Sequence, residues 1–348
     1  MAIDLRVGLL GYGLAGRVFH APLITTTPGM RLTAVVTGDP GRRAQAASDH
    51  PGISVCDDID QVLAGGVDIV VVATPNRSHV PLALRAIGAG AAVVVDKPFA
   101  PTAEEGRRVV AAAAEAGVPL AVFHNRRWDS DFLTVRHLVD TGALGRVLRL
   151  ESRYERWRPA VREVWRESGD RQDAGGLLFD LGSHLIDQAV WLLGPVSRVY
   201  AEVDARRPGA GVDDDVFVAL THVDGARSHL WASSVAAQLG PRLRVLGDRS
   251  AFTIFGLDGQ EQALKDGLRP GAAGWGQEPP EAWGRSGIGE GTTVVPAVPG
   301  RYEVFYRQVV DAVRDGGPMP VDPASAVRVL ELIEAAALSA AEGRVVEV

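Results

Sequence analysis

The chain has 348 residues, of which 46% are apolar and 23% are charged, and its formal net charge is −7. These values are typical of a globular protein large enough for two domains, and they exclude a disordered or fibrous chain. The negative balance argues against general binding to nucleic-acid phosphates, and the single cysteine, Cys56, excludes an internal disulfide and a cysteine-cluster metal site.

The N-terminal segment carries charges at Asp4 and Arg6 and has no long apolar core, so it does not have the pattern of a secretory signal. The remainder contains no uncharged apolar run of about 18 residues, the length needed to cross a membrane as a helix. A lone cysteine also suits a reducing compartment. We therefore expect a cytoplasmic protein that has neither a membrane nor a nucleic acid as its partner.

Residues 1–125 alternate between strand and helix patterns. The predicted strands lie in LRVGLLG, RLTAVVTG, VDIVVVATP, AAVVVDKP and VPLAVFHN. Runs such as IVVVA are apolar at every position, which is typical of strands covered on both faces. The pattern predicts a parallel, doubly wound α/β domain.

Residues 126–348 have a different pattern, in which strands with partial alternation follow one another with few helices between them. This predicts a second α/β domain with a large, mostly antiparallel open sheet, one face of which packs on helices. Helices are expected near residues 302–316 and 325–343. The run Asp213 to Asp215 is expected to be a solvated turn.

Two further segments of this half have open interpretations. Residues 256–300 are rich in Gly and Pro and are expected to form a long functional loop or interaction arm, in which Trp275 and Trp283 either gate a site or become buried at a subunit contact. An arginine stripe lies in RWRPAVREVWRE, and it either contacts an acidic substrate or, as the interspersed glutamates favour, forms a solvated face. Its members are Arg158, Arg162 and Arg166.

Three glycines follow the first predicted strand and open a helix, in the spacing G-x-G-x-x-G: Gly11, Gly13 and Gly16. The first permits a tight turn, the second lets a pyrophosphate approach the backbone, and the third allows close packing of helix on strand. The helix N-terminus adds positive potential. In this context the spacing predicts a dinucleotide site, and the alternative is an incidental glycine-rich turn.

The end of the second strand bears on the choice between NAD and NADP. Asp39 could hold the ribose hydroxyls of NAD, whereas Thr37 with Arg42 and Arg43 could hold the 2′-phosphate of NADP. We favour NADP. The alternative is that GDPGRR is only a turn and a helix start.

Polar residues also follow the next strands, at the sheet edge where open α/β sheets bind ligands. Lys97 ends a buried strand and presents a positive charge there, although a lone turn lysine has no function in most cases. Asn76 and His79 could contact the cofactor, and His79 could equally orient a helix start. The predicted cofactor contacts are Gly11, Tyr12, Gly13, Leu14, Ala15, Gly16, Thr37, Asp39, Arg42, Thr74, Pro75, Asn76, His79, Lys97, Pro98 and Asn125.

The stretch FDLGSHLIDQ, residues 179–188, places Asp180 and His184 four positions apart, and we expect them on one face of a single helix. Histidine titrates near neutral pH and can accept the hydroxyl proton of an alcohol while hydride leaves carbon. Asp180 could orient the imidazole or bind a substrate hydroxyl, and Asp187 lies on the same face. The alternative is a buried structural histidine with a capping aspartate.

These motifs together resemble the glucose–fructose oxidoreductase, inositol dehydrogenase and rhizopine-catabolism family, abbreviated Gfo/Idh/MocA. The resemblance spans nearly the whole chain and rests on the three glycines, TPNRSH, DKP, HNRRWDSDF, GGLLFDLGSHLIDQ and YEVFYRQVVDAVRDG. Asp96 stands where the family usually has Glu. HNRRWDSDF and GLDGQEQALKDGLRPG look most like the scyllo-inositol and polyol dehydrogenases within the family.

The resemblance implies a Rossmann domain at 1–125 and a substrate-binding and oligomerisation domain at 126–348, in a homodimer or homotetramer. It also implies a catalytic set of Lys97, Asp180 and His184. Lys97 would then stabilise the developing alkoxide. The substrate contacts expected from the motifs are Lys97, Arg126, Arg127, Trp128, Asp180 and His184. For residues 126–128, the alternative is a purely structural role.

We therefore predict an NAD(P)-dependent oxidoreductase that acts on a secondary alcohol or ketone of a cyclitol or sugar-like compound, without a metal. Three alternatives of the same fold stay open. One is a catalytically silent NAD(P)-sensing regulator, and another is a glycosidase that uses NAD as a transient redox aid. The third is a reductase of keto-sugar intermediates in secondary metabolism.

Overall fold

The computed structural model describes residues 3–161, 167 and 169–348, and it divides into two compact units. Unit 1 consists of Met1–Asn125, Gln260–Trp275 and Arg301–Val327. Unit 2 consists of Arg126–Gly259, Gly276–Gly300 and Arg328–Val348. Within the arginine stripe, Arg158 is exposed, and Arg162 and Arg166 lie outside the described residues.

Unit 1 contains a parallel sheet in the strand order β3-β2-β1-β4-β5-β6. Its strands are β1 (Leu5–Leu10), β2 (Met30–Val36), β3 (Ser54–Cys56), β4 (Ile69–Val72), β5 (Ala92–Val95) and β6 (Leu120–Val122). Every residue of β4 and β5 is buried, as expected for strands covered on both faces. This confirms the predicted Rossmann architecture.

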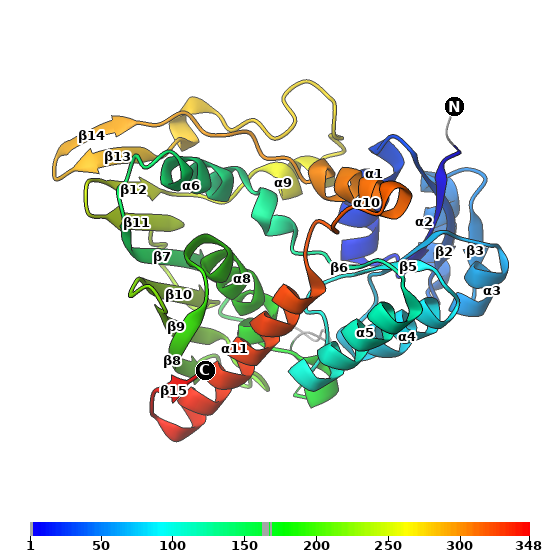
Figure 1. Cartoon of the computed structure of the whole chain (residues 1–348), viewed down its shortest axis with the longest axis horizontal. Coiled ribbons are helices and arrows are strands. Elements are labelled where there is room, and N and C mark those ends of the chain that lie inside the picture. Colours follow the sequence, from blue (N-terminus) through cyan, green and yellow to red (C-terminus); the bar gives the residue numbers. More distant parts are fainter. Residues whose placement is uncertain (1–2, 162–166, 168) are drawn as a thin grey trace. The chain divides into compact units, whose positions relative to one another are not determined.

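Helices cover both faces of this sheet. On one side lie α4 (His79–Gly88) and α5 (Ala103–Ala116), and on the other α1 (Ala21–Thr26) and α10 (Glu303–Asp315) (Figure 1). Thr102 caps α5 by accepting the amide of Glu105, and the left-handed Gly117 ends it. The remaining helices of the unit are η1 (Ala15–His20), α2 (Pro40–Asp49), α3 (Ile59–Ala64), η2 (Asn76–Ser78) and α9 (Gln260–Lys265).

Unit 2 contains a mixed sheet in the order β14-β13-β12-β11-β7-β10-β9-β8-β15, in which only the β7–β10 pair is parallel among the described strands. Its strands are β7 (Val147–Glu155), β8 (Val196–Asp204), β9 (Asp215–His222), β10 (Arg227–Ser233), β11 (Leu243–Gly247), β12 (Ala251–Ile254), β13 (Arg285–Ile288), β14 (Gly291–Val294) and β15 (Val346–Glu347). Burial alternates along β9, so one face of the sheet is covered more than the other. The predicted mostly antiparallel sheet is confirmed.

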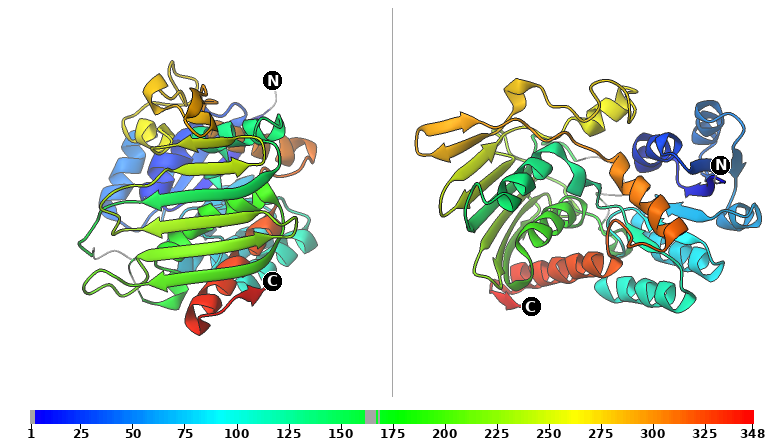
Figure 2. Two further views of the ribbon diagram at one scale, coloured as in Figure 1. Left: turned by 90° about the vertical axis from the view of Figure 1, so that its left-hand side faces the viewer. Right: turned by 45° about the horizontal axis from the view of Figure 1, so that its top comes forward.

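The covered face of this sheet carries α6 (Ser130–Asp140) and α8 (Gly182–Leu193) (Figure 1). The left view of Figure 2 looks onto the opposite face, where the strands lie side by side. The other helical segments are η3 (Asn125–Trp128), η5 (Arg171–Asp173), α7 (Leu177–Asp180), η6 (Pro280–Ala282) and α11 (Pro323–Glu342), which begins in unit 1 and ends in unit 2. Across the described ranges, no helix is long and apolar enough to cross a bilayer.

The expectation of one long loop at 256–300 was wrong, because this segment contains α9, η6 and the hairpin of β13 and β14. The hairpin turns at Gly289, whose φ is +57°, and pairs Ile288 with Gly291. Several glycines dilute the alternation that would otherwise indicate strands. Trp275 is buried in unit 1 and donates to Glu303 (2.8 Å), and Trp283 in unit 2 donates to the carbonyl of Glu278 (3.0 Å).

Candidate functional site

The three glycines of the cradle have different structural roles. Gly11 has a φ of +99°, and a Cβ there would lie 2.4 Å from the carbonyl oxygen of Ala73. A Cβ on Gly16 would lie 2.0 Å from the carbonyl oxygen of Gly11. At Gly13 the nearest atom to a Cβ is Arg42 Nη1, at 3.8 Å. The backbone therefore requires the first and third glycines, and the second faces open space, as the close approach of a pyrophosphate to the backbone would require.

The helix that follows the cradle begins as a π-helix, η1, and continues as α1. The predicted helix is therefore present. The apolar pattern did not predict that its first turns are π-helical. Short π-helical segments occur frequently at functional sites. Leu14, the residue before η1, is 52% exposed, so this end of the helix is open to a ligand.

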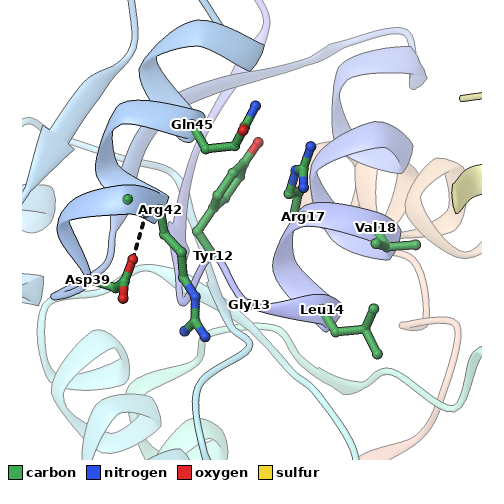
Figure 3. Close-up of a pocket in the computed structure, with 9 residues that line it drawn as sticks. Tyr12, Gly13, Leu14, Arg17, Val18, Asp39, Arg42 and Gln45 are labelled. Atoms are coloured by element: carbon green, nitrogen blue, oxygen red, sulfur yellow. Dashed lines mark hydrogen bonds between the residues drawn. The ribbon is translucent and has the colours of Figure 1, made fainter.

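A pocket of about 420 Å³ lies beside the cradle (Figure 3). It is lined by Tyr12, Gly13, Leu14, Arg17, Val18, Asp39, Gly41, Arg42 and Gln45. Asp39 caps α2 by accepting the backbone amide of Arg42 (2.8 Å), and both side chains line the pocket. The structure thus brings together the cradle and two of the residues predicted to discriminate between NAD and NADP.

The arginines near this pocket differ in their partners. Arg17 donates to Asp49 (3.1 Å), which also accepts from Tyr12 (2.9 Å) and Gln45 (2.6 Å). Burial raises the pKa of the Asp49 carboxyl, but these hydrogen bonds and the charge of Arg17 outweigh it and hold the pKa below its usual value. The charge of Arg17 is therefore largely compensated.

Arg43 also has structural partners, although the sequence suggested that it could bind the 2′-phosphate of NADP. Its guanidinium donates to the carbonyls of Thr37 (3.3 Å), Val55 (3.2 Å) and Cys56 (3.0 Å), and it pairs with Asp57 (2.9 Å). Arg43 therefore joins the ends of β2 and β3. By contrast, the described part of the chain contains no carboxylate paired with the exposed guanidinium of Arg42.

His79 holds the loops that follow β4 and β5. Its buried ring lies 2.9 Å from the carbonyl of Thr74 through Nε2 and 2.9 Å from that of Pro98 through Nδ1. Burial lowers the pKa of His79, and Asp96 and the two carbonyls oppose this only in part. The structure thus gives His79 the orienting role that the sequence left open. Asn76 is buried beside it in η2, and the Lys97–Pro98 bond is cis.

Lys97 follows β5, and its amide donates to the carboxylate of Asp96 (2.9 Å). Near Asp96 lies a histidine that the sequence did not single out. His20 is fully buried at the end of η1, with Nδ1 2.6 Å from the hydroxyl of Tyr306 and Nε2 3.9 Å from Asp96 Oδ1. No motif spacing links these residues, since 286 positions separate His20 from Tyr306.

In unit 2 the expected single helix around Asp180 and His184 was wrong. Helix α7 ends at Asp180 and α8 begins at Gly182, with Leu181 between them at φ −107° and ψ −34°. The amides of His184 and Leu185 both donate to the carbonyl of Leu181 (3.1 Å each), so the chain remains right-handed through the break. His184 is buried, and Asp180 is half-buried.

Asp213 explains where α7 begins. Its carboxylate accepts the amide of Leu178 (2.7 Å), and a Cβ on Gly176 would lie 2.0 Å from that carboxylate. Burial raises the pKa of Asp213 to about 6, although the backbone amides oppose it. The adjacent Asp214 is fully buried and paired with Arg207 (2.7 Å). The expected solvated turn was therefore wrong at these positions.

The residues at positions 126–128, which were predicted to contact the substrate, form contacts with other residues of unit 2. Arg127 and Asp187 form a buried two-bond ion pair at 2.9 and 2.6 Å, so the structure pairs Asp187 with this arginine. Arg126 lies over the ring of Tyr154 at 5.2 Å. Trp128 is buried, as is Asn125 at the end of unit 1.

Near His184, a buried polar cluster surrounds Arg242, which the sequence did not indicate. Its guanidinium donates to Ser152 (2.6 Å), Tyr154 (2.8 Å) and Gln188 (2.9 Å), and pairs with Asp131 (3.0 Å). The ring of Tyr154 lies 6.4 Å from that of His184, centroid to centroid. The cluster connects β7, α6 and α8, the helix that carries His184.

Among the residues described, no group of three or more His, Cys, Asp or Glu side chains could hold a metal ion. The predicted amine, that of Lys97, belongs to unit 1 together with the cradle, and the predicted carboxylate and imidazole belong to unit 2. A glycine cradle at a helix N-terminus can bind a dinucleotide, and an imidazole can accept or release a proton.

Two family models match the chain. "Oxidoreductase family, NAD-binding Rossmann fold" matches residues 5–124, and "Oxidoreductase family, C-terminal alpha/beta domain" matches residues 136–348. The two matches cover nearly the whole sequence.

Three curated relatives illustrate the range of similarity. Scyllo-inositol 2-dehydrogenase (NADP(+)) IolW of Bacillus subtilis is 36% identical, over 98% of this chain and 95% of the relative. The oxidoreductase YdgJ of Escherichia coli is 39% identical over 96% of each chain. D-apiose dehydrogenase of Paraburkholderia graminis is 31% identical, over 97% and 88%.

Among solved structures, yvaA from Bacillus subtilis matches with a TM-score of 0.93 and 35% identity, over 100% of this chain and 99% of the other. YPO2259 from Yersinia pestis matches with a TM-score of 0.92 and 38% identity, over 100% and 98%.

Proposed function

We propose, on the premise that this chain belongs to the Gfo/Idh/MocA family of oxidoreductases, that its substrate is a cyclitol or sugar-like compound. The family and its named relatives make the chain an NAD(P)-dependent dehydrogenase acting on CH–OH groups. The observation that carries the narrower proposal is the full-length similarity to scyllo-inositol 2-dehydrogenase. The reaction would interconvert a secondary alcohol and its ketone.

The proposed roles follow from the chemistry of that reaction. When bound, the nicotinamide supplies the site that takes up or returns the hydride of the substrate carbon. We assign His184 as the group that accepts the hydroxyl proton during oxidation and returns it during reduction. Lys97 stabilises the negative charge that develops on the substrate oxygen. Asp180 orients the imidazole or binds a substrate hydroxyl.

The residues of the cradle fit a dinucleotide, because the space at Gly13 and the open helix end adjoin a pocket of suitable chemistry. We propose NADP as the preferred cofactor and Arg42 as the partner of its 2′-phosphate. Arg42 lines that pocket with an uncompensated charge, whereas Arg17 and Arg43 are bound to other groups. Asp39 caps α2 and so has a structural role independent of the ribose.

Replacing Arg42 with alanine is expected to raise KM for NADPH by about 10-fold or more and to change KM for NADH by less than about twofold. The physical reason is that a charge-assisted hydrogen bond contributes about 1.5–3 kcal/mol. Steady-state kinetics with both cofactors measure this. Arg17→Ala is the matched control in the same pocket and should affect both cofactors alike. An unchanged NADPH to NADH preference in Arg42→Ala would contradict the assignment.

A spectrophotometric screen of inositols, aldoses and keto-sugars with both nicotinamides tests the function. We expect absorbance changes with at least one cyclitol or sugar. Tight cofactor binding without turnover on any compound would instead indicate a regulator, and release of sugar without net cofactor change would indicate a glycosidase. Turnover confined to keto-sugars would indicate the reductase.

We also propose that the uncovered face of the unit 2 sheet forms the subunit contact of a homodimer or homotetramer. Large apolar side chains on or beside this sheet are exposed, among them Phe255 (62%) and Ile288 (74%). Light scattering on the purified protein measures the assembly directly, and a monomer at micromolar concentration would exclude it.

A further inference from the structure

A buried polar cluster in unit 1 includes Asp96, the residue that precedes Lys97. It consists of His20, Asp96 and Tyr306, from η1, the end of β5 and α10. His20 and Tyr306 have no exposed surface, and the side chain of Asp96 is 14% exposed. Buried polar groups impose a desolvation penalty, so this cluster must be held by its own contacts.

The contacts of His20 favour one tautomer of its ring. Nδ1 of His20 is 2.6 Å from the Tyr306 hydroxyl, and Nε2 faces the Asp96 carboxylate at 3.9 Å. A neutral imidazole has one N–H, and the carboxylate favours that hydrogen on the nitrogen facing it. The Tyr306 hydroxyl then donates to Nδ1. Burial raises the pKa of Tyr306 well above its ordinary value, which keeps the phenol protonated as this arrangement requires.

Asp96 is the end of the cluster that meets Lys97. Its Oδ1 accepts the Lys97 amide at 2.9 Å and also faces His20, so one oxygen connects the lysine backbone to the histidine. Burial raises the pKa of Asp96, but His20, Lys97 and His79 outweigh it and hold the pKa below its usual value. The carboxylate is therefore ionised at neutral pH.

We propose that Asp96, held by His20 and Tyr306, is a positioning residue that fixes the strand end carrying Lys97. This inference rests on the proposed function, because it concerns how Lys97 acts. The titratable groups that face Asp96 are His20 from η1, Tyr306 from α10, His79 from α4 and the adjacent Lys97.

Asp96→Asn isolates the charge, because asparagine keeps an oxygen that can accept the Lys97 amide. Loss of the carboxylate charge weakens the contact with His20 and loosens the strand end that carries Lys97. We expect kcat to fall by roughly 10-fold while KM for the cofactor changes by less than about twofold, because a small misplacement of a catalytic group lowers kcat rather than cofactor binding. Asp96→Glu keeps the carboxylate and should restore kcat to within about threefold of the wild-type value.

Tyr306→Phe removes the hydroxyl that holds His20 and should lower kcat several-fold while KM for the cofactor changes little. Tyr302→Phe is its matched control, since Tyr302 is also fully buried and immediately precedes α10. Wild-type kcat in Asp96→Asn, or equal kcat in the two tyrosine variants, would overturn the proposal.

Lys97→Ala separates this proposal from the proposed function. If Lys97→Ala loses turnover while Asp96→Asn keeps the wild-type kcat, only the positioning role fails. If Lys97→Ala keeps near-normal turnover, the assigned role of Lys97 fails, and the role of Asp96 fails with it. A loss of kcat in Asp96→Asn that Asp96→Glu restores supports both.

Discussion

Replacing His184 with alanine is expected to lower kcat by about 10²- to 10⁴-fold, because general acid–base catalysis by a placed side chain contributes about that much. Replacing Lys97 with alanine should lower kcat by a factor of about 10² or more, since an electrostatic contact to a developing oxyanion is lost. Stopped-flow or steady-state assays at saturating cofactor measure both effects. Cofactor affinity, followed by NADPH fluorescence, should largely survive in each variant.

The chain offers a matched control for each variant. The sequence contains two lysines, Lys97 and Lys265, and the second is a half-exposed residue paired with Glu261, so Lys265→Ala should keep full activity. His222 is a buried histidine whose nitrogens lie 2.9 Å from the Gly194 carbonyl and 2.8 Å from the Ser228 hydroxyl. His222→Gln should therefore reduce stability rather than kcat. Near-normal turnover in both His184→Ala and Lys97→Ala would refute the assigned roles.

Among the substitutions proposed for this protein, replacing Arg242 with methionine should cause the largest loss of stability. We expect the free energy of unfolding of unit 2 to fall by about 3–5 kcal/mol. The reason is that Asp131, whose side chain is 3% exposed, would keep a buried charge without its ion-pair partner. The acceptors on Ser152, Tyr154 and Gln188 would also lose a donor. Urea unfolding, with hydrogen exchange of the α8 amides as the local probe, measures the effect.

Two further variants separate the buried charge from simple loss of packing. The double variant Arg242→Met with Asp131→Asn removes both charges and should regain part of the lost stability. Arg244→Met lies two residues away, and its side chain is 43% exposed beside Glu151, so its cost should stay within about 1 kcal/mol. Equal losses in Arg242→Met and Arg244→Met would show that the buried cluster does not stabilise unit 2.

Several features could be predicted from the sequence because they depend on residues close together in the chain. The apolar runs of β4 and β5 predicted buried parallel strands, and the spacing of Gly11, Gly13 and Gly16 predicted the cradle. The partial alternation after residue 125 predicted the mostly antiparallel sheet. Each pattern arises from local periodicity or from a turn that requires glycine. The family and the NAD(P)-dependent chemistry followed from the order of these motifs.

Errors arose where local patterns were weak or misleading. Glycines at 287, 289 and 291 dilute the strand pattern of β13 and β14, so a hairpin was mistaken for a loop. Three consecutive aspartates suggested a solvated turn, yet Asp213 caps α7 and Asp214 pairs with Arg207. The same cap places the start of α7, and the helix then breaks at Leu181 rather than running on to His184.

By itself, the sequence of this protein determined the buried strands of its parallel sheet, its dinucleotide cradle and the residue types available for proton and hydride chemistry, because these depend on neighbours along the chain. Only the tertiary structure decided which arginine keeps an uncompensated charge, how Asp187 pairs with Arg127, and how His20 meets Tyr306 across 286 positions. It also decided that residues 260–275 and 301–327 join the first unit. Ion pairs and buried hydrogen bonds depend on distances in space, and no local spacing encodes them.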